Sequence, residues 1–77
     1  MIKLMLLGTA GCHLCEEAEL ILADCKNAEI ELIDIAEQEQ WQEKYAIRIP
    51  VLYHAETGEE LGWPFDLQQA QIFINDL

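Results

Sequence analysis

The side chains best suited to chemistry in this chain are two cysteines, Cys12 and Cys15, with two residues between them. A thiolate is a strong nucleophile, and two thiols at this spacing can close and reopen a disulfide. The pair follows an apolar segment that ends at Gly8 and precedes a segment with helical periodicity. This position predicts that Cys12 lies at a helix N-terminus, where unpaired backbone N–H groups and the helix dipole stabilise a thiolate.

The position of each cysteine predicts a separate role. Cys12, at the helix end, is the expected nucleophile, and Cys15, in the first turn, is close enough to attack a mixed disulfide formed on Cys12. His13 lies between them and would favour the thiolate when it is protonated. Cys25 continues the apolar face of the predicted helix, too far along to join the pair, and we expect it to pack as a small buried residue.

Hydropathy patterning predicts the elements that position these cysteines. Strands are predicted at residues 2–7, 29–35, 51–54 and 59–62, and helices at residues 14–25, 35–46 and 67–77. Asp66 is predicted to cap the last helix, and the turn at residues 56–58 to join the last two strands as a hairpin. The order is therefore βαβαββα, in one α/β domain over residues 1–77.

Composition and charge restrict the partners of the chain. Its 77 residues carry 15 Asp and Glu against 4 Lys and Arg, a net charge of −11, which repels nucleic acid and anionic membranes. No apolar run approaches the roughly 20 residues that span a bilayer, and no secretory signal follows the first residue. Three cysteines are an odd number and too few for a secreted disulfide scaffold. We therefore expect a cytoplasmic monomer with no nucleic-acid or membrane partner.

The chain resembles the glutaredoxin branch of the thioredoxin superfamily over nearly its whole length. The resemblance is carried by the βαβαββα order, by Cys12-x-x-Cys15 after the first strand, and by Arg48-Ile49-Pro50 before the third strand. The segment Leu61-Gly62-Trp63-Pro64-Phe65-Asp66 is similar to that of short bacterial glutaredoxin-like proteins that share a Trp-Pro-Phe-Asp segment.

The resemblance implies a thioredoxin fold whose four-stranded mixed sheet has the order 2-1-3-4, flanked by three helices. It also implies thiol–disulfide exchange on protein disulfides or on glutathione, with no cofactor beyond glutathione as a candidate co-substrate. Pro50 would be a cis proline facing the cysteines, and the Ile49 backbone would pair with an extended substrate segment. Arg48, Ile49, Pro50 and His13 are thus the expected substrate-binding residues.

Departures from the glutaredoxin pattern favour protein disulfides over glutathione as substrate. Glutaredoxins usually carry Pro-Tyr between the cysteines and a basic residue shortly before them. Here His13 and Leu14 separate the cysteines, and the preceding loop has no basic residue. Arg48 is the only fixed cation expected near Cys12, whereas glutathione brings two carboxylates that need positive charge or backbone N–H groups.

Two other functions use the same residues. Cys12 and Cys15 have a zinc-like spacing, but a closed site needs four ligands, and the other candidates, His13 and His54, are badly placed, so we expect no metal site. A dimer could share a [2Fe–2S] cluster through Cys12, and a brown colour after anaerobic purification would favour that reading. A third alternative is a redox-inactive interaction domain, whose cysteine pair would be inert to reductants.

The charge distribution predicts the effect of salt. Exposed charges are screened beyond about 8 Å at physiological salt, so raising ionic strength should speed reduction of the oxidised protein by glutathione and hardly affect uncharged dithiothreitol. Arg48→Ala should slow the glutathione reaction, and Glu16→Gln combined with Glu17→Gln should accelerate it. Stopped-flow rates of reduction by glutathione that change neither with ionic strength nor with these substitutions would contradict the prediction.

Overall fold

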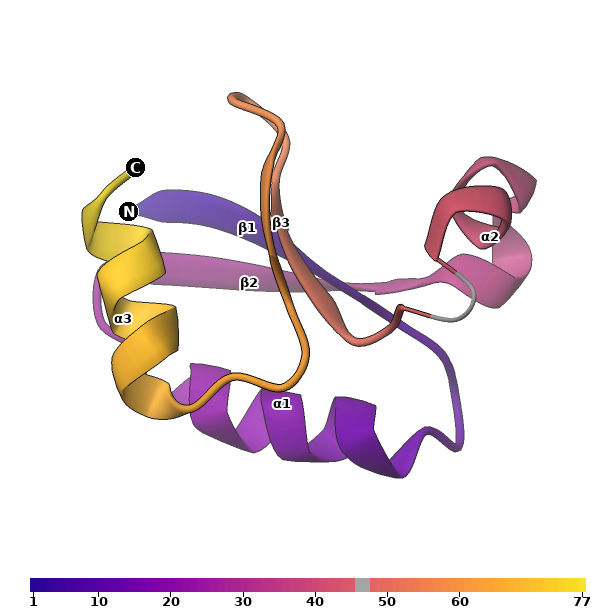
Figure 1. The fold of residues 1–77 in the computed structure, drawn as a ribbon, viewed down its shortest axis with the longest axis horizontal. Coiled ribbons are helices and arrows are strands. Elements are labelled where there is room, and N and C mark those ends of the chain that lie inside the picture. The colour runs from indigo at the N-terminus through magenta and orange to yellow at the C-terminus, as the bar shows by residue number, and fades with distance from the viewer. Residues whose placement is uncertain (46–47) are drawn as a thin grey trace.

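A computed structural model of the chain describes residues 1–45 and 48–77. Its elements are β1 (Ile2–Gly8), α1 (His13–Ala23), β2 (Ala28–Asp34), the 3₁₀ turn η1 (Ile35–Glu37), α2 (Glu39–Tyr45), β3 (Val51–His54), β4 (Glu59–Gly62) and α3 (Leu67–Asn75) (Figure 1). The sheet order is β2-β1-β3-β4, which confirms the predicted 2-1-3-4 order. β1 is parallel to β2 and antiparallel to β3, which pairs antiparallel with β4. None of the helices within the described ranges is long and apolar enough to cross a bilayer.

Each face of the sheet has its own hydrophobic core, because successive side chains of a strand point to opposite faces. The core under α1 and α3 comprises Leu4, Leu6, Ala18, Leu22, Leu52, Phe65, Ala70 and Ile74. The core under α2 comprises Leu7, Ile35, Tyr45 and Val51. The adjacent pairs Leu6–Leu7 and Val51–Leu52 each divide between the two cores, so both faces of the central strands are buried.

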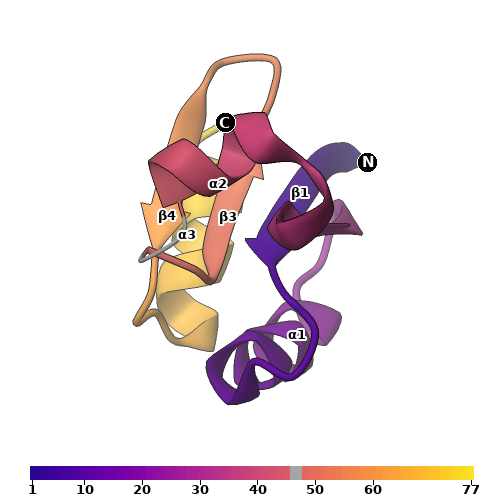
Figure 2. The same cartoon turned by 90° about the vertical axis from the view of Figure 1, so that its right-hand side faces the viewer.

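The loop before α1 and the segment before β3 lie at the same end of the sheet. Leu7, near the end of β1, pairs with Val51, the first residue of β3. Figure 1 shows the β1–α1 loop and the segment leading into β3 at this end, and Figure 2 views the molecule from that side. The antiparallel pairing of β1 with β3 therefore brings residues 9–12 and 48–50 towards one another.

The prediction of one continuous helix over residues 35–46 is wrong. Residues 35–37 form a 3₁₀ turn. Gln38 follows it with extended backbone angles (φ −134°, ψ 102°), and this residue separates the turn from α2. Local hydrogen bonds stabilise the turn: Asp34 accepts the N–H of Ala36 at 2.9 Å, and the Gln42 side chain donates to the Ala36 carbonyl at 2.6 Å. The predicted end of this helix at Ala46 lies outside the described residues.

Helices α1 and α3 agree with the prediction more closely at their starts, His13 and Leu67, than at their ends, Ala23 and Asn75. α1 ends at Ala23, so Cys25 lies just after the helix rather than on it, and Asn27 turns the chain with φ 65°. Asp66 is the N-cap of α3, as predicted: it accepts the N–H of Gln69 at 2.7 Å, and the Gln69 side chain accepts the N–H of Asp66 at 3.0 Å. This reciprocal pair is a capping box, which satisfies two backbone donors.

A polar network joins α2 to β4. The Tyr45 hydroxyl, in a side chain that is 1% exposed, donates to Glu60 Oε2, and Arg48 Nη2 donates to Glu60 Oε1. Burial and the hydrogen bond to Glu60 raise the pKa of Tyr45 to about 12. The hydrogen bonds from Tyr45 and Arg48 hold the pKa of Glu60 below its ordinary value.

This network predicts a pH-dependent contribution to stability. Because the pKa of Glu60 is lower in the folded state than in the unfolded state, its contribution is present above the ordinary value of 4.5 and is lost as pH falls through the folded pKa. Glu60→Gln should therefore lower the free energy of unfolding at neutral pH. Between neutral pH and pH values below 4.5, the free energy of unfolding should fall less in this variant than in the unsubstituted protein. Urea unfolding across a pH series measures the free energy of unfolding at neutral pH and its change with pH. Glu59→Gln is the control, and identical pH profiles for the two variants would contradict the prediction.

Candidate active site

The sulfur of Cys12 caps the N-terminus of α1. Cys12 has extended backbone angles (φ −86°, ψ 109°), and its Sγ accepts the N–H of Cys15 at 3.1 Å. Its carbonyl accepts the N–H of Glu16 at 3.1 Å, which begins the helix. A side-chain acceptor at this position satisfies a backbone donor that the helix leaves unpaired, and it gains from the positive end of the helix dipole. The structure thus places Cys12 where a thiolate is favoured.

Cys15 is the covered member of the pair. It is disulfide-bonded to Cys12, with their Cα atoms 5.2 Å apart, and it is 6% exposed, whereas Cys12 is half-buried. An external reactant therefore reaches the sulfur of Cys12 more readily than that of Cys15. The third cysteine, Cys25, is half-buried and separate, and burial together with the Asp24 carboxylate raises the pKa of its thiol.

Two glycines let the chain reach this geometry. A Cβ on Gly8 would lie 2.9 Å from the Sγ and 3.3 Å from the Cβ of Cys15, so β1 can approach the helix only with glycine there. Gly11 has φ 76°, a conformation that favours glycine, immediately before Cys12. From the sequence alone, Gly8 is expected only to end a strand. Its contact with Cys15 could have been suspected from a glycine that lies between a buried strand and the cysteine pair.

Pro50 lies across the sheet end from the cysteines. Its peptide bond with Ile49 is cis, and since Val51 pairs with Leu7, Pro50 comes next to Gly8. The Pro50 carbonyl accepts the N–H of Trp63 at 3.2 Å, which continues the β3–β4 pairing by one residue. The structure also has a second cis bond, between Trp63 and Pro64, that sequence reasoning missed.

The remaining candidate residues make contacts that the sequence did not indicate. The Ile49 N–H donates to the Tyr45 carbonyl at 3.2 Å. His13 is exposed, and its ring nitrogens lie 3.8 Å from a Glu16 oxygen and 4.0 Å from a Glu17 oxygen. Arg48 is paired with Glu60. That partner follows from the hairpin register, in which Glu60 lies opposite Tyr53 on the face that α2 covers.

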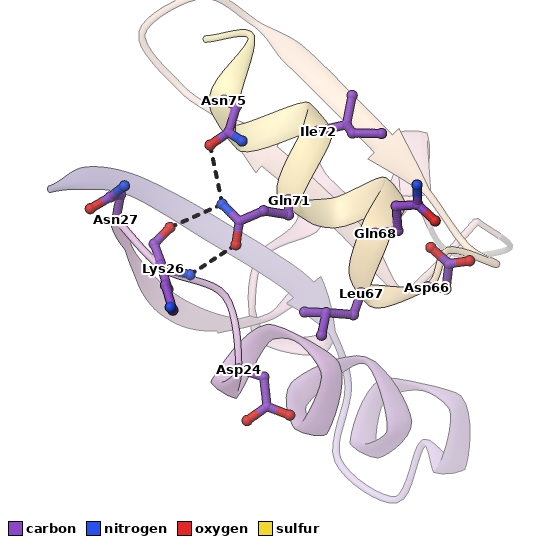
Figure 3. A pocket seen from close by; sticks show the side chains of 9 residues that line it. All are labelled: Asp24, Lys26, Asn27, Asp66, Leu67, Gln68, Gln71, Ile72 and Asn75. Atoms are coloured by element: carbon purple, nitrogen blue, oxygen red, sulfur yellow. Dashed lines mark hydrogen bonds between the residues drawn. The ribbon is translucent and has the colours of Figure 1, made fainter.

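Two surface hollows lie at opposite ends of α1. One, of about 240 Å³, is lined by Gly8, Cys15 and Leu32 among others. The other, of about 900 Å³, lies between the end of α1 and α3, where Gln71 holds the Lys26 backbone with hydrogen bonds of 3.0 and 3.3 Å (Figure 3). It is separated from Cys12 by the 11 residues of α1, about 16 Å, and is not part of the same site.

The described residues also bear on the metal-binding alternative. Within residues 1–45 and 48–77, no three His, Cys, Asp or Glu side chains gather where they could hold a metal ion. This finding concerns one chain only. A cluster shared between two copies through Cys12 stays a hypothesis.

Comparison with known proteins identifies relatives of this chain. Residues 3–75 match the glutaredoxin-like domain family (DUF836). The X-ray structure of Northeast Structural Genomics target protein XcR50 from X. campestris is 30% identical, with a TM-score of 0.87, and the match covers 96% of this chain and 97% of that one. The solution structure of the same target gives 30% identity and a TM-score of 0.83 over 96% and 94% of the two chains. No curated protein matches the chain. The resemblance stated from the sequence is confirmed.

The geometry predicts unequal reactivity of the two thiols. Only Cys12 gains from the helix end, and Cys15 is covered, so at neutral pH iodoacetamide should modify Cys12 faster by on the order of tenfold. The rates are measured by mass spectrometry in Cys15→Ser and Cys12→Ser variants, both with Cys25→Ser so that one thiol remains. Equal rates in the two variants would show that the helix end does not activate Cys12.

Proposed function

The chain belongs to the glutaredoxin-like domain family, and on that premise we propose that it is a thiol–disulfide oxidoreductase of protein substrates. The family and the Cys12–Cys15 pair at disulfide distance fit a thiol redox module. The observation that carries the proposal is the hydrogen bond from the Cys15 N–H to the Cys12 sulfur at the start of α1. It stabilises negative charge on the sulfur that is the more exposed of the two.

The reaction begins with attack of the Cys12 thiolate on one sulfur of a substrate disulfide. A bond forms between Cys12 and that sulfur, the substrate disulfide breaks, and the other substrate sulfur leaves as a thiolate that takes up a proton. The Cys15 thiol then loses its proton and attacks the sulfur of Cys12. This second exchange closes the Cys12–Cys15 disulfide and releases the second substrate thiol, so two electrons pass from the protein to the substrate.

The unequal burial of the cysteines supports this order of events. A substrate of protein size can reach the sulfur of Cys12, while Cys15 lies behind it at 6% exposure, against β1 at Gly8. The Cα atoms of the two cysteines are 5.2 Å apart, within the range of a disulfide, so the second attack needs no rearrangement of the backbone. Cys12 therefore acts first and Cys15 resolves the mixed disulfide.

The surroundings of Cys12 support protein disulfides, rather than glutathione, as substrates. His13 lies beside Glu16 and Glu17, and Arg48 is paired with Glu60, on a chain of net charge −11. A glutathione molecule with two carboxylates meets repulsion here, whereas an extended protein segment can pair with the Ile49 carbonyl next to cis Pro50. Such a reductant suits the cytoplasm, where thiols are kept reduced. We expect it to act there as a monomer.

A redox titration tests the activity. In a glutathione redox series, mass spectrometry should show that Cys12 and Cys15 together lose two hydrogen atoms, that is two protons and two electrons, reversibly and at a potential within about −200 to −270 mV. If no such loss appears at any ratio, the protein is not a dithiol reductant.

A trapping experiment identifies the substrates. Cys15→Ser, expressed in the source cell, should accumulate mixed disulfides on Cys12 because the resolving thiol is missing, and these can be identified by mass spectrometry. Cys12→Ser is the matched control and should trap nothing, while Cys25→Ser should behave as the unsubstituted protein does. Trapped species that consist of glutathione alone would contradict the proposal of protein substrates.

A further inference from the structure

We infer that Glu60 is a specificity-determining residue: by neutralising Arg48 it makes the site discriminate against small thiols and disulfides that carry carboxylates. The inference rests on the proposed function and names a residue that decides between its substrate classes. Glu60 lies in β4, which holds none of the residues expected from the sequence to bind substrate.

The side chain of Arg48 is turned away from the end of the sheet. Arg48 comes two residues before Pro50, and its backbone N–H donates to the Tyr45 carbonyl at 2.8 Å. Glu60 lies opposite Tyr53, two positions further along β3 than the Val51–Gly62 pair at the sheet end. To reach Glu60, the guanidinium lies over the Tyr45 ring, with its carbon 5.2 Å from the ring centroid. The Arg48 guanidinium therefore lies on the face of the sheet that α2 covers, directed away from the end that holds the cysteines.

Glu60 is itself held in place. The buried Tyr45 hydroxyl donates to Oε2 and Arg48 donates to Oε1, so each carboxylate oxygen has a partner. The Glu60 side chain is 25% exposed and that of Arg48 is 44% exposed, so the carboxylate is the more enclosed member of the pair. The same hydrogen bonds favour the ionised form of Glu60. At neutral pH the pair therefore presents a net charge of zero.

Charge on the other side of Cys12 adds to the discrimination. Glu16 and Glu17 are exposed in the first turns of α1, with their carboxylates near the His13 ring. Lys26 lies beyond the far end of this helix, by the hollow against α3 (Figure 3). A reactant with carboxylates is therefore repelled by Glu16 and Glu17, and the neutralised Arg48 does not offset this repulsion. A neutral or basic protein segment is not repelled.

Reduction of the oxidised protein by glutathione is the reaction that reports this discrimination. One glutathione thiolate attacks the sulfur of Cys12, a mixed disulfide forms, and Cys15 leaves as a thiolate that takes up a proton. A second glutathione thiolate attacks the glutathione sulfur of that mixed disulfide, glutathione disulfide forms, and Cys12 leaves as a thiolate. Two glutathione thiols are oxidised and the protein gains two electrons.

The experiment compares a charged thiol with an uncharged one. Glu60→Gln keeps a side chain of the same shape but removes the carboxylate that holds the Arg48 guanidinium along the α2 face, so an uncompensated cation can turn towards a reactant at Cys12. The ratio of the rate constants for glutathione and for 2-mercaptoethanol should rise about threefold, as one charge at several ångströms in water implies. Stopped-flow tryptophan fluorescence or acid quenching with mass spectrometry follows the reduction.

Matched variants separate the effect of Arg48 from that of net charge. Glu59→Gln removes the same charge from the neighbouring exposed residue and should change the ratio less. Arg48→Gln replaces an exposed side chain and leaves the Glu60 carboxylate without the Arg48 cation, so it should lower the ratio. The double variant Arg48→Gln with Glu60→Gln has no guanidinium to release, so its gain over Arg48→Gln alone should be smaller than the gain that Glu60→Gln produces when Arg48 is present.

The outcomes distinguish this inference from the proposed function. If Glu60→Gln and Glu59→Gln give the same ratio, or if the gain survives removal of Arg48, the inference is overturned while the oxidoreductase activity stands. A Cys12–Cys15 disulfide that neither thiol reduces contradicts the proposed function and the inference together.

Discussion

The hydrogen bond between the Cys15 N–H and the Cys12 sulfur is the interaction on which the site depends. It exists because Cys12 takes the N-cap position of α1, where the backbone offers a donor that the helix cannot use. Gly8 and Gly11 allow that position, one by letting β1 approach Cys15 and the other by adopting a positive φ before the cap. The reactivity that we propose for Cys12 therefore depends on how β1 ends and α1 begins.

The sheet supplies the second half of the site. Because β1 and β3 are antiparallel, the strand that ends before the cysteines lies beside the strand that follows cis Pro50. α2 stabilises that segment through Tyr45, whose carbonyl accepts the N–H groups of Arg48 and Ile49 and whose hydroxyl reaches Glu60. The same network that holds the segment in place also neutralises its cation. In the proposal above, Glu60 therefore serves both the structure of this segment and the choice of substrate.

Local patterns in the sequence predicted the order of elements and the N-cap cysteine, since these depend on periodicity and on the residue at a helix start. The sheet order was implied by the resemblance to glutaredoxins and not by these patterns. The break at Gln38 was not predicted because it depends on side-chain hydrogen bonds of Asp34 and Gln42 that hydropathy does not reveal. The Arg48–Glu60 pair was missed for a different reason. It depends on which face of the sheet each residue of the hairpin occupies, and that requires the register of β3 with β4.

The most direct test of the account is the pKa of the Cys12 thiol in a Cys15→Ser, Cys25→Ser variant, followed by thiolate absorbance in the ultraviolet. The serine keeps the backbone N–H that the Cys12 sulfur accepts, so the account predicts a pKa clearly below the value of about 8.5 for an unperturbed cysteine. The Cys12→Ser, Cys25→Ser variant, which retains only Cys15, should show no such depression. A pKa of Cys12 at or above about 8.5 would contradict the claim that the start of α1 activates this residue.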